Sequence, residues 1–144
     1  KLMIQDPFWC DCHFMVQKEV AERMAAKAGT KAYGRLSVNL QAVAKVKIVL
    51  TVPPEVFVPK PKVDSAVVKI QPRSSIFDSP RELEALREIT SLAFGQRRKM
   101  LRNSLASLEI DSSFFDLTLR PEKVKLEEFT IMAKWFVKSS HVIK

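Results

Sequence analysis

The chain has 144 residues, of which 47% are apolar, and a formal net charge of +8. The apolar fraction suffices for a folded core, which excludes a disordered chain, and the length suits one domain or one domain with part of another. No apolar run approaches the roughly 18 residues of a membrane-spanning helix, so no membrane insertion is expected. The basic excess favours nucleic acid or an anionic surface as partner, although a merely lysine-rich soluble domain has the same composition.

The two cysteines, Cys10 and Cys12, are separated by a single residue. This spacing is too tight for an ordinary disulfide, and no second pair is present to complete a zinc site. The first residues also lack the pattern of a secretory signal peptide. We therefore expect reduced thiols, no bound metal and a cytoplasmic location.

Residues 13–29 run from a short apolar stretch into an amphipathic helix. Val16, Val20 and Met24 recur every four residues, and Gly29 can end the helix. This spacing predicts one helix with a single buried face.

A second helix and two strands follow. The apolar spacing in residues 33–46 predicts the helix, and residues 46–52 alternate as a strand does until Pro53 and Pro54 stop it. Residues 66–70 alternate in the same way and predict a further strand. The first part of the chain, residues 1–75, therefore reads as α/β.

Residues 76–144 read as a small all-α bundle. Ser79, Pro80 and Glu82 together predict a helix start with a capping box. Gly95 separates that helix from one expected over residues 96–108, and a last helix is expected over 126–138.

The segment QRRKMLR, residues 96–102, is the sharpest charge feature. It holds four cations and no acid: Arg97, Arg98, Lys99 and Arg102. Such like charges repel, so an anion that neutralises them would be stabilising, and phosphates are the natural candidates. Charge runs are more often solvated helix faces, but the lack of interleaved glutamates favours binding here.

Phe57 precedes a stiff, charged segment that contains Pro59, Lys60, Pro61 and Lys62. The prolines restrict the backbone and place the segment at or outside a sheet edge. A rigid aromatic ring among cations suits stacking on a nucleic-acid base. From the pattern alone, core packing by Phe57 and loop shaping by the prolines is the better interpretation.

Four motifs carry a family resemblance: FMVQKEVAERM, KAYGRLSV, FVPKPKVDSAVVKI and FGQRRKMLRNSL. In this order and spacing they resemble the small-subunit rRNA adenine N6-dimethyltransferases (dimethyladenosine transferases), whose relatives include the erythromycin-resistance rRNA methyltransferases. The resemblance runs from about residue 14 to about residue 137. The segment RPEKVKLEEF is similar to the family's closing segment, although Lys125 stands where a small helix-capping residue is usual.

The resemblance implies an S-adenosylmethionine-dependent enzyme that dimethylates two adjacent adenines of small-subunit rRNA during ribosome biogenesis. It implies a Rossmann-like domain followed by a helical domain that grips rRNA in the immature small subunit. Phe57 falls where the family has the aromatic that stacks on the flipped-out target adenine. The expected RNA-binding residues are Lys60, Lys62, Arg97, Arg98, Lys99 and Arg102. We expect the protein to be a monomer.

The family's cofactor-binding motifs have no counterpart here. Gly29, Gly34 and Gly95 are too far apart for a glycine-rich loop, and Asn39-Leu40 is followed by Gln41 where the family has a proline. The chain thus resembles the C-terminal portion of the enzyme: residues 1–75 are the distal strands and helices of its sheet, and residues 76–144 its rRNA-binding domain. Alone, it is expected to be inactive and to bind no S-adenosylmethionine. Alternatives are a catalytically inactive RNA-binding or ribosome-assembly module, and a mitochondrial transcription-factor relative.

Overall fold

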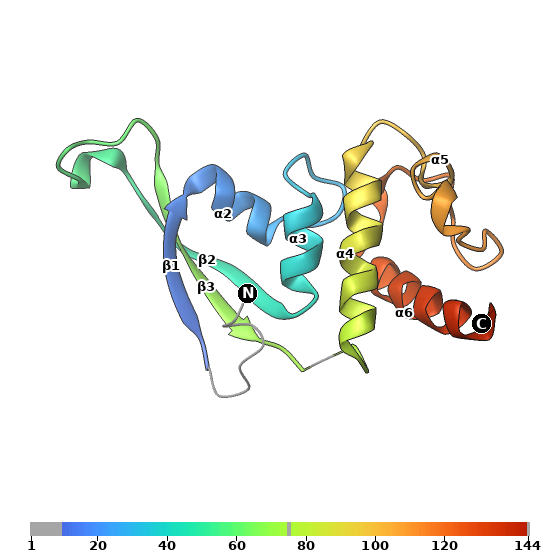
Figure 1. Cartoon of the computed structure of the whole chain (residues 1–144). Coiled ribbons are helices and arrows are strands. Elements are labelled where there is room, and N and C mark those ends of the chain that lie inside the picture. Colours follow the sequence, from blue (N-terminus) through green and yellow to red (C-terminus); the bar gives the residue numbers. More distant parts are fainter. Residues whose placement is uncertain (1–9, 75, 144) are drawn as a thin grey trace.

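The computed structural model describes residues 10–74 and 76–143, in which a three-stranded sheet is followed by a group of helices (Figure 1). The strands are β1 (Cys12–Gln17), β2 (Ala44–Val52) and β3 (Ser65–Pro72). The α-helices are α2 (Lys18–Ala25), α3 (Arg35–Gln41), α4 (Pro80–Gly95), α5 (Leu101–Ser104) and α6 (Leu126–Ile143). Single 3-10 turns lie at Pro54–Val56, Ala106–Leu108 and Pro121–Lys123. No helix in the described ranges is long and apolar enough to cross a membrane.

The sheet has the order β1-β3-β2, and β3 pairs with both neighbours in antiparallel orientation. A bulge in β2 between Ile48 and Leu50 shifts its pairing with β3 by one residue. The expected α/β arrangement and both expected strands are confirmed. The additional strand, β1, is formed by the short apolar run before α2, which is too brief for its alternation to predict a strand.

One face of the sheet is covered by α2 and α3 (Figure 1). Ala66, Val68 and Ile70 point to that face from β3 and pack in one apolar cluster with Ala21 of α2 and Leu40 of α3. The burial of alternate β3 residues fits a strand with one face against the core.

The opposite face of the sheet has no covering helix among the described residues. Met15 and Leu50 both pair with Val67 and therefore share its face. Their exposed fractions are 54% and 53%. This face therefore exposes apolar side chains next to charged ones, since Lys47 and Lys69 pair on the same face.

A second apolar cluster joins the first part of the chain to the helices. Tyr33 and Val38, from the segment that leads into and forms α3, pack with Leu86 of α4 and with Phe129 and Met132 of α6. α4 lies between α3 and α6 (Figure 1). The two predicted domains, residues 1–75 and 76–144, thus share an apolar cluster. The domain boundary at residue 75 stays a prediction.

The helix expected over residues 33–46 ends earlier, at Gln41. The carbonyl of Val43 accepts a hydrogen bond from the Arg73 amide, just beyond the end of β3. The Val43 carbonyl therefore bonds to the end of the neighbouring strand and does not continue the helix, and β2 begins at Ala44.

The helix expected over residues 96–108 is interrupted and much shorter. α5 covers only Leu101–Ser104, and residues 96–99 form a turn and bend. The reason is that the Leu101 and Arg102 amides donate to the carbonyls of Leu119 and Leu117, both at 2.9 Å. The first three cations of the QRRKMLR segment consequently lie in a turn and not on a helix face.

The expected capping box at Ser79 is also incomplete. Ser79 is the N-cap of α4 but makes no side-chain capping bond. The Glu82 carboxylate instead accepts a hydrogen bond from the Asp78 amide at 2.8 Å. The helix start was correctly predicted, but Glu82 bonds to the Asp78 amide and not to the amide of the N-cap, Ser79.

Candidate nucleic-acid interface

Phe57 lies on the connection between β2 and β3, which projects beyond the end of the sheet (Figure 1). Pro54–Val56 forms a 3-10 turn, and the Phe57 amide closes it by donating to the Pro54 carbonyl at 3.1 Å. The peptide bond between Val58 and Pro59 is cis. We call this connection, residues 53–64, the Phe57 arm.

The Phe57 side chain is half-buried and belongs to neither of the two apolar clusters. It lines a shallow surface cavity of about 350 Å³, open to solvent, together with Pro59 and Pro61 of the arm. From the sheet, Met15, Val16, Gln17 and Ser65 complete the lining. The core-packing interpretation of Phe57 therefore does not hold for the described residues.

Two polar side chains face this mostly apolar cavity. Gln17 ends β1, Ser65 begins β3, and the two residues are paired in the sheet, which places both side chains on the same face. A small apolar cavity with a few polar groups at one end is the usual form of a site for a planar organic ligand. Gln17 and Ser65 were not singled out from the sequence, because their proximity to Phe57 arises only from the strand pairing.

The two lysines of the arm are in different surroundings. Lys60 Nζ lies 3.3 Å from a carboxylate oxygen of Glu55, and both side chains are exposed. Lys62 lines an adjacent groove whose other charged residues include Glu19 and Asp64. Both lysines are thus near carboxylates, which weakens their attraction for phosphate.

The basic segment lies at the C-terminal end of α4, on the same upper side of the molecule in Figure 1 as the Phe57 arm. Arg98, Lys99 and Arg102 are exposed and make no ion pair within the described part of the chain. Their backbone is fixed: Lys99 N–H donates to the Gln96 carbonyl at 3.0 Å, and Arg102 N–H to that of Leu117. We call Arg98, Lys99 and Arg102 the basic cluster.

Arg97 is exposed like its neighbours but differs from them because its guanidinium bonds to the segment before α3. One terminal nitrogen, Nη2, donates to the carbonyl oxygen of Tyr33 at 2.7 Å and to that of Lys31 at 3.4 Å. The guanidinium carbon also lies 5.7 Å from the centre of the Phe94 ring. The four cations predicted as one stripe are therefore three residues that face solvent and one, Arg97, that bonds to backbone carbonyls.

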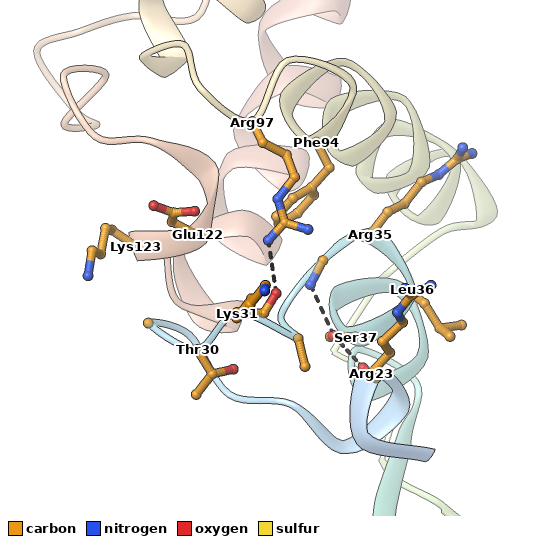
Figure 2. Close-up of a pocket in the computed structure, with 13 residues that line it drawn as sticks. Arg23, Thr30, Lys31, Arg35, Leu36, Ser37, Phe94, Arg97, Glu122 and Lys123 are labelled. Atoms are coloured by element: carbon orange, nitrogen blue, oxygen red, sulfur yellow. Dashed lines mark hydrogen bonds between the residues drawn. The ribbon is translucent and has the colours of Figure 1, made fainter. Parts of the chain in front are cut away.

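Arg97 lines a pocket of about 820 Å³ between the sheet part and the helices, shown in Figure 2. The other cations of the lining are Arg23, Lys31, Arg35 and Lys123, and its one carboxylate is Glu122. Figure 2 shows Arg35 and Lys123 pointing away from each other, so these cations form a basic rim and not a cage around one anion. The sequence did not reveal this rim because its members are dispersed along the chain.

Tyr33 precedes Gly34 of the pocket lining, and its side chain stabilises the fold. Its hydroxyl donates to the Val124 carbonyl at 2.8 Å, and its ring meets Phe94 edge-on at 5.8 Å. Burial raises the pKa of the Tyr33 phenol far above its ordinary value, and the charges of Glu127 and Glu128 raise it further. The phenol is therefore neutral at physiological pH and serves as a hydrogen-bond donor.

No group of His, Cys, Asp or Glu side chains suited to a metal ion is present in the described ranges. The candidate interface therefore consists of an aromatic cavity on the Phe57 arm and exposed cations after the end of α4. Such a combination of a stacking surface and phosphate-binding cations is typical of proteins that bind single-stranded nucleic acid.

Comparison with known proteins gives consistent matches. The model of a family described as "Ribosomal RNA adenine dimethylase" matches residues 2–138. The chain is 49% identical over 130 residues to a ribosomal RNA small subunit methyltransferase A of Legionella pneumophila, covering 87% of this chain and 50% of that protein. A protein of the same name from Shewanella piezotolerans is 46% identical over 129 residues, covering 87% and 48%. The chain thus spans about half the length of these relatives.

Solved structures show the same fold. A dimethyladenosine transferase from Plasmodium falciparum matches with a TM-score of 0.84 and 26% identity, covering 97% of this chain and 62% of that chain. A 23S rRNA methyltransferase, ErmE, matches with a TM-score of 0.53 and 20% identity, covering 91% and 57%. The second likeness concerns the fold alone.

Proposed function

Because the chain belongs to the ribosomal RNA adenine dimethylase family, we propose that it forms the RNA-binding half of an enzyme that dimethylates two adjacent adenines of small-subunit rRNA. The methyl donor of the whole enzyme is S-adenosylmethionine, and its substrate is the immature small ribosomal subunit in the cytoplasm. The relatives named ribosomal RNA small subunit methyltransferase A support this assignment. The enzyme acts as a monomer.

The observation on which the proposal depends is the cavity beside Phe57. An adenine amine in a structured RNA is occupied by pairing or stacking, so the base must be extruded before it can react. Phe57 would stack on the extruded adenine, and the polar groups of Gln17 and Ser65 would hydrogen-bond to its edge. The apolar lining of the cavity would exclude water from the base.

The basic cluster would bind RNA phosphates outside the cavity. Arg98, Lys99 and Arg102 are exposed and unpaired in the described residues. Each phosphate contact releases condensed counterions, so this part of the affinity depends on salt. In this arrangement the base is selected at the arm and the backbone is held at the end of α4.

The residues described here do not fit S-adenosylmethionine. A Rossmann-like cofactor loop has closely spaced glycines directly after a strand, whereas Gly29 lies between α2 and α3, Gly34 precedes α3 and Gly95 ends α4. We therefore assign the cofactor contacts to the part of the protein beyond this chain. Calorimetric titration checks this, and stoichiometric micromolar binding of S-adenosylmethionine by the chain alone would contradict it.

The three strands would then be the distal strands of a larger Rossmann-like sheet, and residues 76–144 the helical rRNA-binding domain. The structural likeness to the dimethyladenosine transferase supports this division. A catalytically inactive RNA-binding module could use the same phosphate contacts, but it would have no need of an aromatic residue beside a base-sized cavity.

Substitution of Phe57 in the full-length enzyme tests the proposal. Stacking on one base is worth roughly 1–3 kcal/mol, so Phe57→Ala should slow single-turnover methylation about tenfold to a hundredfold. Phe57→Trp should retain most of the rate because it keeps an aromatic face. RNA affinity should change little, because it depends on many phosphate contacts.

Thermal melts of the same variants separate stacking from packing. If Phe57 stabilised the fold, alanine would lower the melting temperature and tryptophan would be as harmful as alanine. An unchanged methylation rate in Phe57→Ala, or a rate that declines only with the folded fraction, would refute the stacking role.

A further inference from the structure

The sheet part and the helices are linked covalently through residues 73–79, and they also pack through α3 on α4 and through the segment between α2 and α3. The Gly29 amide donates to the Glu122 carbonyl at 2.7 Å. The Tyr33 hydroxyl donates to the Val124 carbonyl at 2.8 Å. Residues 29–34, which we call the junction loop, are thus attached to the helical part at its Pro121–Lys123 turn.

Arg97 attaches the same loop to the other side, at the end of α4. Its Nη2 donates to the carbonyls of Tyr33 and Lys31, at 2.7 and 3.4 Å. Its Nη1 lies against Gly34, 3.6 Å from the position that a Cβ there would occupy. Figure 2 shows the side chain extending from the end of α4 across the pocket to the junction loop.

The chemistry of these contacts is specific to arginine. A guanidinium has several donors in one plane, so it can bond to two carbonyl oxygens while one face rests on the Phe94 ring. A lysine ammonium is a single point of charge on a flexible stem and cannot reproduce this arrangement. The contacts also occupy Nη2, which a phosphate would otherwise use.

We propose that Arg97 is a positioning residue that fixes the basic cluster relative to the Phe57 arm. The inference rests on the proposed function, in which phosphates are held by the cluster while an adenine is held in the cavity. Arg97 is adjacent to the cluster in sequence, and the junction loop lies between α2 and α3, the helices that cover the sheet. The rate of catalysis depends strongly on such positioning, because a misplacement of the reacting groups by about 1 Å can lower the rate about a hundredfold.

Distance measurement between two spin labels tests the positioning role in this chain. Suitable label positions are Val58, which is 99% exposed on the arm, and the exposed Asn103 on α5. These two residues are changed to cysteine, and Cys10 and Cys12 to serine. We expect a narrow distance distribution in the parent, a clearly broadened one in Arg97→Ala and an intermediate one in Arg97→Lys.

Arg98→Ala is the matched control, because it removes the same charge from the next residue. It should leave the distance distribution unchanged. An equally narrow distribution in Arg97→Ala and in the parent would overturn the proposal, and Arg97→Lys tests it independently if the alanine variant does not fold.

Salt titration with a single-stranded RNA oligonucleotide supplies a second readout. Arg98→Ala should reduce the slope of log affinity against log salt by about 0.7, the value for one single-strand phosphate contact, whereas Arg97→Ala should change it by less than half as much. An equal reduction in both variants would make Arg97 a phosphate contact and overturn the proposal. If neither variant changes the slope but Arg97→Ala broadens the distances, the phosphate-binding role fails and the positioning role remains.

Discussion

Arg97 and Arg98 are adjacent and chemically identical, yet one bonds to the junction loop and the other faces solvent. The difference arises in the turn after α4. There the chain ends a helix, reverses and pairs with residues 117–119, so successive side chains leave in different directions. Neighbouring cations in one segment can therefore make different kinds of contact.

The basic cluster should account for most of the salt dependence of RNA binding. Replacing Arg98, Lys99 and Arg102 together by alanine should reduce the slope of log affinity against log salt by about 2, at about 0.7 per single-strand phosphate. Affinity for an RNA oligonucleotide, measured at several salt concentrations, gives the slope directly.

A control with the same change of charge is available. Lys45, Lys47 and Lys138 are exposed residues that line neither the Phe57 cavity nor the pocket beside Arg97. Their triple alanine variant should lower the slope far less. Equal slopes in the two triple variants would mean that RNA responds to net charge and that the cluster is a solvated surface.

The sequence singles out candidate residues more readily than it indicates the contacts between them. Phe57 and the basic segment are recognisable because aromatic and charged side chains stand out from their neighbours. The contacts of Arg97 cannot be recognised from the sequence, because its partners are the backbone carbonyls of Lys31 and Tyr33. Every residue has such a carbonyl. Gln17 was likewise missed, because only the pairing with Ser65 brings it to the cavity.

Among the elements, β1 combines an unpaired edge with an exposed apolar side chain, Met15. It pairs with β3 on one side and with no strand on the other within the described residues. Met15 of β1 and Leu50 of β2 are about half exposed on the uncovered face. Free edges and apolar faces of this kind promote association between chains.

Charges placed on the uncovered face should reduce self-association of the isolated chain. Met15→Lys with Leu50→Lys should shift the association measured by sedimentation or light scattering to higher protein concentration. Thermal stability should change little, because both side chains already contact solvent. Ile131→Lys is the control, since Ile131 is 57% exposed on α6, away from the sheet. If Ile131→Lys had the same effect as the double variant, the uncovered face would not be the site of association.

Element boundaries show what apolar spacing can and cannot predict. The start of α4 was predicted well because Ser79 and Pro80 are local signals. The break before α5 was not predicted, because it depends on hydrogen bonds from the Leu101 and Arg102 amides to carbonyls of residues 119 and 117. Long-range hydrogen bonds compete with local helical ones, and no nearby residue indicates which prevails.

At the scale of the whole molecule, the sheet part and the helices should unfold together, because residues of both share one apolar cluster. Tyr33 is central to that core, and it is the only tyrosine of the chain. Its ionisation can therefore be followed by absorbance without interference from another phenol.

Alkaline titration should show that Tyr33 ionises only as the chain unfolds. Burial raises its pKa in the folded state above the ordinary value near 10. The stabilisation from the neutral phenol is therefore complete below about pH 10 and is lost as the pH rises toward the folded-state pKa. Phenolate absorbance and far-ultraviolet circular dichroism should change together. Phenolate that appears with a pKa near 10 while the helical signal persists would show that Tyr33 is accessible.

The strand order β1-β3-β2 has a consequence for the time course of synthesis. Gln17 pairs with Ser65, and Val52 pairs with Ser65 from the other side, so both outer strands leave the ribosome before their shared partner exists. Within the described residues no sheet can form until Ser65–Pro72 has been translated, and it then forms around its last strand in one step. Until then Ala21 of α2 and Leu40 of α3 lack their β3 partners, and apolar surface that is exposed at this stage promotes aggregation.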